Sequence, residues 1–142
     1  MSKTVGLLSG LSLVLVVACG APSAATPPAT LGPVRYATVE ASGQPAGSTL
    51  VEMTSYAFKP GDIPLTAGTV VIYLVNPSTE VHSMALRNPA VSILNVVALS
   101  AEVGAGHSAI FTIENLPAGV YRVTCPITNH ADLGMVATAT VR

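Results

Sequence analysis

Charged residues are scarce in this sequence. Asp, Glu, Lys and Arg make up 9% of its 142 residues, and 6 basic side chains face 7 acidic ones. A protein that binds nucleic acid carries its basic residues clustered in a stripe, so this balance excludes that class. The sequence also lacks a second block of distinct composition. We therefore expect one domain with extensions and no nucleic-acid partner.

The sequence lacks an apolar run long enough to cross a membrane as a helix. The run Val5–Val17 is shorter than the ~20 apolar residues that a spanning helix needs. It follows the positively charged Lys3 and has the length of the apolar core of a signal peptide. We therefore predict that residues 1–18 are a signal peptide and that the remainder of the chain is extracytoplasmic.

Only two cysteines are present, and the first of them ends the apolar run. The segment Val16-Val17-Ala18-Cys19-Gly20 resembles the bacterial lipobox, in which the cysteine is lipidated and becomes the new N-terminus. Acyl chains contribute about 0.8 kcal/mol per buried CH₂, so two or more hold a protein at a membrane. We predict a lipid on Cys19 and attachment to the cell membrane. The alternative is an ordinary signal peptide cleaved near Ala18 or Ala21.

Residues 20–33 are dominated by Ala, Pro and Thr, which cannot form a core and are typical of a flexible tether. Residues 34–39 could form an edge strand, but residues 42–47 have the composition of a linker again. The predicted boundaries are a lipid-anchored tether at residues 19–47 and a folded domain at residues 48–142.

The domain lacks any long segment with the 3.6-residue periodicity and caps of a helix. From Ser48 onwards, short β-branched runs alternate with turns rich in Gly, Pro, Asn and Ser. This pattern predicts an all-β fold, a Greek-key β-sandwich of seven to eight strands. The strands expected from it are Leu50–Thr54, Thr69–Val75, Ser83–Leu86, Ser92–Val97, Ser108–Ile113, Val120–Thr124 and Val136–Val141.

Cys125 is the only thiol that remains once Cys19 is lipidated, so a disulfide within the monomer is excluded. On the strand ending at Cys125, Tyr121 and Val123 lie on the same face as the cysteine, while Arg122 lies on the opposite face. Because Arg122 must face water, Cys125 points inward at the end of a strand. A thiol there is well placed to bind a soft metal ion. We expect Tyr121 to be structural, with a buried ring and a tethered hydroxyl.

The loop after this strand has the spacing Cys125-x4-His130-x4-Met135. A thiolate, imidazoles and a weak thioether are the ligands of electron-transfer copper sites. A second imidazole must then come from His82 or His107. His82 is the better candidate because it follows a turn-rich loop and precedes a strand. His107 opens a strand after a Gly turn, where an exposed polar residue is expected, and Met135 could instead be a core residue.

The stretch from Val51 to Val141, about two thirds of the chain, resembles the cupredoxin family of blue copper proteins, such as azurin, plastocyanin and auracyanin. The segments that carry the resemblance are Tyr56–Pro60, Val75-Asn76 with His82, Leu116–Tyr121 and Cys125–Met135. Four residues between Cys and His are typical of azurin and auracyanin.

The resemblance implies a sandwich with one type 1 copper ion at its end. Carried over by position, the ligands are His82, Cys125, His130 and Met135. Relatives commonly have Asn after the first copper-binding His, where this chain has Ser83. We expect Ser83, together with Asn76, to lie next to the ligands and to tune the site. Asn129 stands where relatives often have Gly, and Asn tolerates a left-handed backbone.

The family also implies a function in single-electron transfer rather than an enzymatic one. One edge of His130 should lie near solvent, surrounded by an apolar patch for weak docking of a redox partner such as a cytochrome or a terminal oxidase. The residues expected in this patch are Pro126, Ile127, Ala131 and Leu133. We expect the protein to be a monomer.

Four other interpretations compete with electron transfer. A copper carrier or storage protein that delivers copper to an extracytoplasmic oxidase would share the ligand set. A thiol hydrolase could use Cys125 with His130, but the sequence offers no convincing orienting residue. A zinc site would not normally include a thioether, and a binuclear copper centre needs a second cysteine in the loop.

Overall fold

The computed structural model describes residues 32–92 and 94–142. The predicted signal peptide, Cys19 and the first part of the tether lie outside the described residues. The described chain forms ten β-strands: β1 (Arg35–Glu40), β2 (Thr49–Thr54), β3 (Ala57–Lys59), β4 (Asp62–Leu65), β5 (Gly68–Val75), β6 (Ala85–Arg87), β7 (Val96–Leu99), β8 (Ser108–Leu116), β9 (Gly119–Thr124) and β10 (Val136–Val141).

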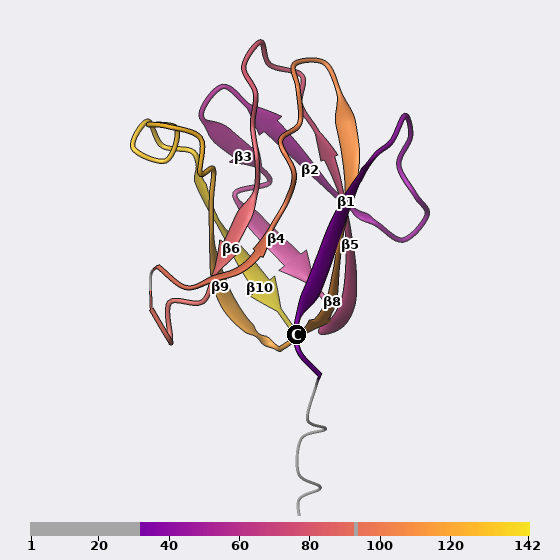
Figure 1. The fold of residues 1–142 in the computed structure, drawn as a ribbon, viewed down its shortest axis with the longest axis vertical. Coiled ribbons are helices and arrows are strands. Elements are labelled where there is room, and N and C mark those ends of the chain that lie inside the picture. The colour runs from indigo at the N-terminus through magenta and orange to yellow at the C-terminus, as the bar shows by residue number, and fades with distance from the viewer. Residues whose placement is uncertain (1–31, 93) are drawn as a thin grey trace, which may run out of the picture.

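The strands form two five-stranded sheets that pack face to face (Figure 1). The first sheet has the order β1-β8-β5-β2-β3 and the second the order β4-β10-β9-β6-β7. Most neighbouring strands are antiparallel, whereas β2 with β5 and β4 with β10 are parallel. This arrangement confirms the predicted all-β sandwich.

The core lies between the sheets and follows the two-residue period of the strands. On β8, Ala109, Phe111 and Ile113 are buried, while the residues between them are partly exposed. Because successive side chains of a strand point to opposite faces, this alternation directs one face of each strand to the core. The largest fully buried core side chains on the strands are Phe111, Met53, Ile63, Ile72, Leu74, Leu86, Ile113, Leu116 and Val51.

Strand β1 lies within the segment that we expected to be tether. It pairs with β8 from Arg35 opposite Glu114 to Glu40 opposite Ala109. The folded part of the chain therefore begins before residue 48, and the expected domain boundary is too late. Residues 42–47 have the composition of a linker because they form the connection between β1 and β2. This composition moved the expected domain boundary past the first strand.

Several expected strands differ in extent from those in the structure. The segment Ser92–Val97 was placed too early, because residues 88–92 form a turn and the strand is Val96–Leu99. Strand β6 begins at Ala85, so Ser83 precedes it. Strands β3 and β4 were not expected, and each is too short to show a periodic pattern. Pro64 in β4 is tolerated because β4 is at the edge of its sheet.

The chain ends and the loop between β9 and β10 lie toward opposite ends of the sandwich. The chain enters β1 beside Glu114 and ends after β10, so both ends of the described chain lie at one end of the molecule. The loop between β9 and β10 lies toward the other end (Figure 1). Across residues 32–92 and 94–142, no helix has the length and apolar character needed to cross a membrane.

Tyr121 ties β9 to the turn that precedes it, as expected. The side chain is 2% exposed, and its hydroxyl donates a hydrogen bond of 2.8 Å to the carbonyl of Pro117. Burial raises the pKa of Tyr121 above its ordinary value, which keeps the hydroxyl protonated as a donor.

The substitution Tyr121→Phe is expected to lower the free energy of unfolding by about 1 kcal/mol, because it leaves the Pro117 carbonyl without this donor. Urea denaturation of the metal-free protein measures the effect. Tyr36→Phe is the control, since Tyr36 is 49% exposed on β1. Equal stability of the Tyr121→Phe and Tyr36→Phe proteins would show that the bond contributes nothing.

Candidate metal centre

Two imidazoles and a thiol converge in the interior of the protein. One ligand atom each from His82, Cys125 and His130 lies within 4.8 Å of the others, and all three residues are buried. The Nδ1 atoms of His82 and His130 are 3.2 Å apart, and Sγ of Cys125 is 3.5 Å from Nδ1 of His130. The structure thus brings together three of the four residues expected to bind copper through atoms suited to a soft metal ion.

Strand β9 and the loop that follows it position Cys125. Val123 and Tyr121 share the inward face with Cys125, whereas Arg122 faces solvent. This confirms the expected inward direction of the thiol. Thr124 differs from the simple alternation because it is also buried, at 6% exposure, and its hydroxyl accepts a hydrogen bond from the Arg87 side chain.

Main-chain hydrogen bonds hold the loop from Cys125 to Met135 in shape. The Met135 carbonyl accepts from the Cys125 amide at 3.2 Å, and the Met135 amide donates to the His130 carbonyl at 2.9 Å. The Met135 side chain is fully buried. Asn129 has φ of +68°, which bears out the tolerance expected of Asn at this position. The backbone therefore links Met135 directly to two of the converging residues.

A short polar loop after β5 positions His82. The His82 backbone exchanges two hydrogen bonds with Val103, of 3.1 and 2.8 Å. Nε2 of the ring lies 2.9 Å from the Ser78 hydroxyl. Ser78 therefore holds the His82 ring through Nε2, while Nδ1 on the other side of the ring faces His130.

Asn76 organises this loop from a fully buried position. Its amide group donates to the carbonyls of Glu80 and Val103 at 2.7 and 2.8 Å. Its side-chain oxygen accepts from the backbone amide and the hydroxyl of Ser78, at 3.1 and 2.7 Å. All hydrogen-bonding positions of this buried amide are occupied, so Asn76 holds together the loop that carries His82.

The Ser78 hydroxyl sets the tautomer of His82. A hydroxyl has one hydrogen, and Oδ1 of Asn76 at 2.7 Å and the Glu80 carbonyl at 3.2 Å are both acceptors for it. Toward His82 the hydroxyl is then an acceptor, so Nε2 carries the ring hydrogen and Nδ1 keeps a lone pair. Burial and then the neighbouring His130 imidazole lower the pKa of His82, against a smaller opposite effect of Glu80. The neutral imidazole therefore presents a free donor atom to the centre.

The donor set fits a single transition-metal ion. Imidazole nitrogens and thiolate sulfur bind such ions at about 2.0–2.3 Å, so two ligands of one ion stand roughly 3–4 Å apart. The separations of 3.2 and 3.5 Å agree with this requirement. Two imidazoles with one thiolate, next to a buried methionine, form the set that favours copper over magnesium or calcium.

Tyr56 is part of the site but was not identified as such from the sequence. Its ring packs edge-on against that of His130, with centroids 5.1 Å apart. Tyr56 lies in the tight turn between β2 and β3, with φ of +63°. Tyr56 and His130 are far apart in the sequence and meet only in the folded chain, so local sequence offered no signal. Ser78 lies four residues before His82, but the sequence does not show that its hydroxyl meets the ring.

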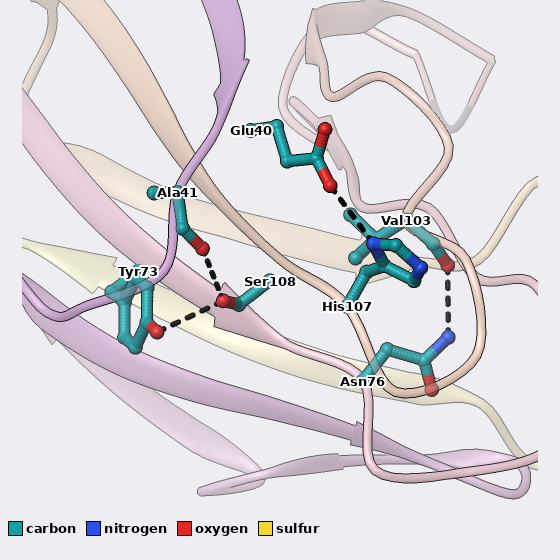
Figure 2. A network of polar contacts seen from close by, with 7 residues as sticks. All are labelled: Glu40, Ala41, Tyr73, Asn76, Val103, His107 and Ser108. Atoms are coloured by element: carbon teal, nitrogen blue, oxygen red, sulfur yellow. Dashed lines mark hydrogen bonds and ion pairs between the residues drawn. The ribbon is translucent and has the colours of Figure 1, made fainter.

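His107 lies outside the centre, so the choice of His82 was the better one. Its Nδ1 is 2.8 Å from the carboxylate of Glu40, and both side chains are exposed. Figure 2 shows this pair, together with the bond from Asn76 to Val103 that supports the His82 loop. The backbone carbonyl of His107 accepts a hydrogen bond of 2.9 Å from the backbone amide of Asn76. His107 therefore contributes to the loop through its backbone.

The remaining expected site residues lie around the ligand loop. The Ser83 hydroxyl donates to the Ser100 carbonyl at 3.0 Å, so its side chain supports the segment that follows β7. In the expected patch, Pro126 and Leu133 are exposed, whereas Ile127 and Ala131 are partly buried. His130 itself is 9% exposed, which leaves one edge of the ring near the surface.

Comparisons with known proteins agree with this geometry. A family model of the sulfocyanin (SoxE) domain matches residues 62–142, more than half of the chain. Comparison with curated proteins gives no match.

Among solved structures, auracyanin A, a "blue" copper protein from Chloroflexus aurantiacus, is 22% identical with a TM-score of 0.56 over 68% of this chain and 100% of that one. The reduced auracyanin of Roseiflexus castenholzii is 18% identical, with a TM-score of 0.57 over 66% and 94%. A reduced amicyanin variant is 13% identical, with a TM-score of 0.58 over 78% and 100%. These structures share the fold of the chain.

The substitution Ser78→Ala is expected to weaken Cu(II) binding by about 10- to 100-fold, because it removes the acceptor that orients His82. Competition with a chelator of known affinity measures the change. Ser55→Ala is the control, since the Ser55 hydroxyl bonds to Glu80 at 3.0 Å and not to an imidazole. Equal affinities in both variants would contradict the orienting role of Ser78.

Proposed function

The chain belongs to the sulfocyanin (SoxE) family, whose domain is of the cupredoxin type, and on this premise we propose that it is a mononuclear type 1 copper protein. It carries single electrons between redox partners outside the cytoplasm. The observation that supports this proposal most directly is the convergence of two Nδ1 atoms and one Sγ atom in a buried position.

Each ligand has a role that follows from its chemistry. His82 and His130 supply neutral nitrogen donors, Cys125 supplies the thiolate, and Met135 supplies a weak thioether. A bound copper ion supplies one-electron chemistry between Cu(I) and Cu(II). The chain's own contribution is to keep the donor atoms in place in both states and to exclude water.

The hydrogen bonds around the ligands help to keep the donor atoms in place. Cys125, His130 and Met135 are joined through backbone bonds within one loop. His82 is held through its own backbone by Val103 and through its ring by Ser78. Ligands fixed on packed strands and supporting hydrogen bonds change position little when the charge of the metal changes.

We propose the apolar patch around His130 as the main docking face for a redox partner. Leu133 is 55% exposed and Pro126 is exposed beside it. Redox encounters are short-lived and typically bury less than ~1,200 Å² in total. A cytochrome or a terminal oxidase would therefore meet a face that is small, apolar and adjacent to the exposed edge of His130.

The lipid anchor on Cys19 is part of the same proposal. The described chain enters the fold beside Glu114, toward the end of the sandwich that also carries the C-terminus. The ligand loop lies toward the opposite end (Figure 1). An anchor joined through the preceding residues would leave the metal centre free to meet a partner.

Burial of the ligands favours electron transfer over the competing functions. Cys125 is 1% exposed and its sulfur lies 3.5 Å from Nδ1 of His130, so the buried thiol is turned toward the imidazole rather than toward solvent. A copper carrier needs ligands that a partner can reach, whereas His82 and Met135 are fully buried. Repeated oxidation and reduction without loss of copper distinguishes the electron carrier from the copper carrier.

Cys125→Ser is expected to abolish the intense visible absorption of the copper-loaded protein, because the band arises from the thiolate. His82→Gln is expected to reduce copper binding strongly. Absorption and electron paramagnetic resonance spectra measure both. His107→Gln is the control, since it removes an imidazole outside the centre. A wild-type protein that stays colourless with Cu(II) would overturn the proposed function.

Leu133→Asp is expected to slow electron transfer to a docking protein by about tenfold while leaving the visible spectrum unchanged, since a desolvated charge disfavours the apolar contact. Stopped-flow reduction by a c-type cytochrome measures the rate. Val120→Asp adds the same charge at another exposed apolar residue, 58% exposed on β9, and serves as control. Equal rates in both variants would remove Leu133 from the docking face.

A further inference from the structure

A groove of about 320 Å³ opens beside the ligand loop, on the outer face of the second sheet. It lies between the loop after β9 and the loop between β6 and β7. Its lining includes Arg87, Leu94, Arg122, Thr124, Cys125 and Asp132. The groove therefore reaches Cys125, a proposed metal ligand, and shares Pro126, Ile127 and Ala131 with the patch around His130.

Two arginines lie directly opposite each other in this groove. Arg87 on β6 pairs in register with Arg122 on β9. Opposite residues of an antiparallel pair have Cβ atoms about 4.5–5.5 Å apart, and like charges at such positions are destabilising. The sequence has only 6 Lys and Arg in total, so a third of its basic residues are placed where they repel each other.

The Arg87 side chain is held in place on the groove floor. Its Nε donates to the Thr124 hydroxyl at 3.1 Å, and a terminal nitrogen donates to the Leu94 carbonyl at 3.4 Å. These bonds hold the guanidinium between the end of β9 and the loop that joins β6 to β7. Its remaining N–H donors are free to meet an acceptor in the groove.

The protein itself does not neutralise the pair. Asp132 also lines the groove, yet within residues 32–92 and 94–142 the one ion pair joins His107 to Glu40. Arg122 is exposed and makes no side-chain hydrogen bond to any described residue. With two arginines and one aspartate, the groove keeps an excess of one positive charge.

Apolar side chains border the charged floor. Leu94 is 78% exposed at one side, and Pro126 and Ile127 lie at the other. Such a surface matches a partner segment that presents a carboxylate flanked by apolar residues. Arginine suits this recognition because its planar guanidinium binds a carboxylate through two parallel hydrogen bonds.

We propose that this groove receives an Asp- or Glu-bearing segment of the redox partner protein. The inference rests on the proposed function for the identity of the partner, and on the arginine pair for the chemistry of the contact. A bound carboxylate relieves the repulsion between Arg87 and Arg122 and fixes the orientation of the partner beside Cys125. Opposite charges also raise the association rate, an effect that salt weakens.

The test is an NMR titration of the ¹⁵N-labelled mature protein with an acetylated peptide of sequence Leu-Glu-Glu-Leu, first without metal and then with Cu(I). We expect shifts confined to the amides of the groove, and about tenfold weaker binding by Arg122→Gln at low ionic strength. Arg122 is exposed, so this variant is expected to fold. Both peptides carry C-terminal amides, so the matched peptide Leu-Gln-Gln-Leu has no carboxylate and should not bind.

Arg35→Gln is the control variant, because it removes the same charge from β1 in the other sheet. Peptide binding that is equal in the Arg122→Gln and Arg35→Gln proteins, or shifts outside the groove, would overturn the inference. The metal-free titration separates the two proposals. Binding in the groove by a protein that takes up no copper would retain the anion site and reject the electron carrier.

Discussion

The structure depends on a contact that an ordinary protein interior avoids. Two imidazole nitrogens lie 3.2 Å apart, with a thiol 3.5 Å from one of them, in a buried position. Buried polar groups are costly unless each is satisfied. Here Ser78 satisfies the far side of His82, and the ring of Tyr56 packs on His130. The unshared donor atoms are left facing a common point, which is the property a metal site requires.

The two-sheet architecture makes this convergence rigid. His82 comes from the connection between β5 and β6, whereas the other ligands come from the loop between β9 and β10. Strand β6 pairs with β9, so the two connections leave adjacent strands of one sheet. Asn76 fastens the first connection to Val103, and backbone bonds close the second around Met135. The ligands are therefore held by elements whose positions the core already determines.

Because this protein has few charged residues, each arginine contributes a large share of its surface charge. In the proposed function, exposed Pro126 and Leu133 near His130 would suit weak and reversible contact. The groove with Arg87 and Arg122 would add direction, because a charged contact restricts the orientations in which a partner can approach.

Much of this protein was determined by local sequence. Turn residues between short β-branched runs indicated a sandwich, and the spacing Cys125-x4-His130-x4-Met135 indicated copper, because strand period and ligand chemistry are local properties. Strands β3 and β4 could not be predicted, since they are too short to have a period. The role of Tyr56 depends on His130, which is distant in the sequence, whereas Ser78 lies only four residues before His82 and meets it through the folding of one loop. The loop setting of His82 already favoured it over His107, whereas the tertiary structure alone paired His107 with Glu40 and set the two arginines opposite each other, because strand pairing decides which distant residues meet.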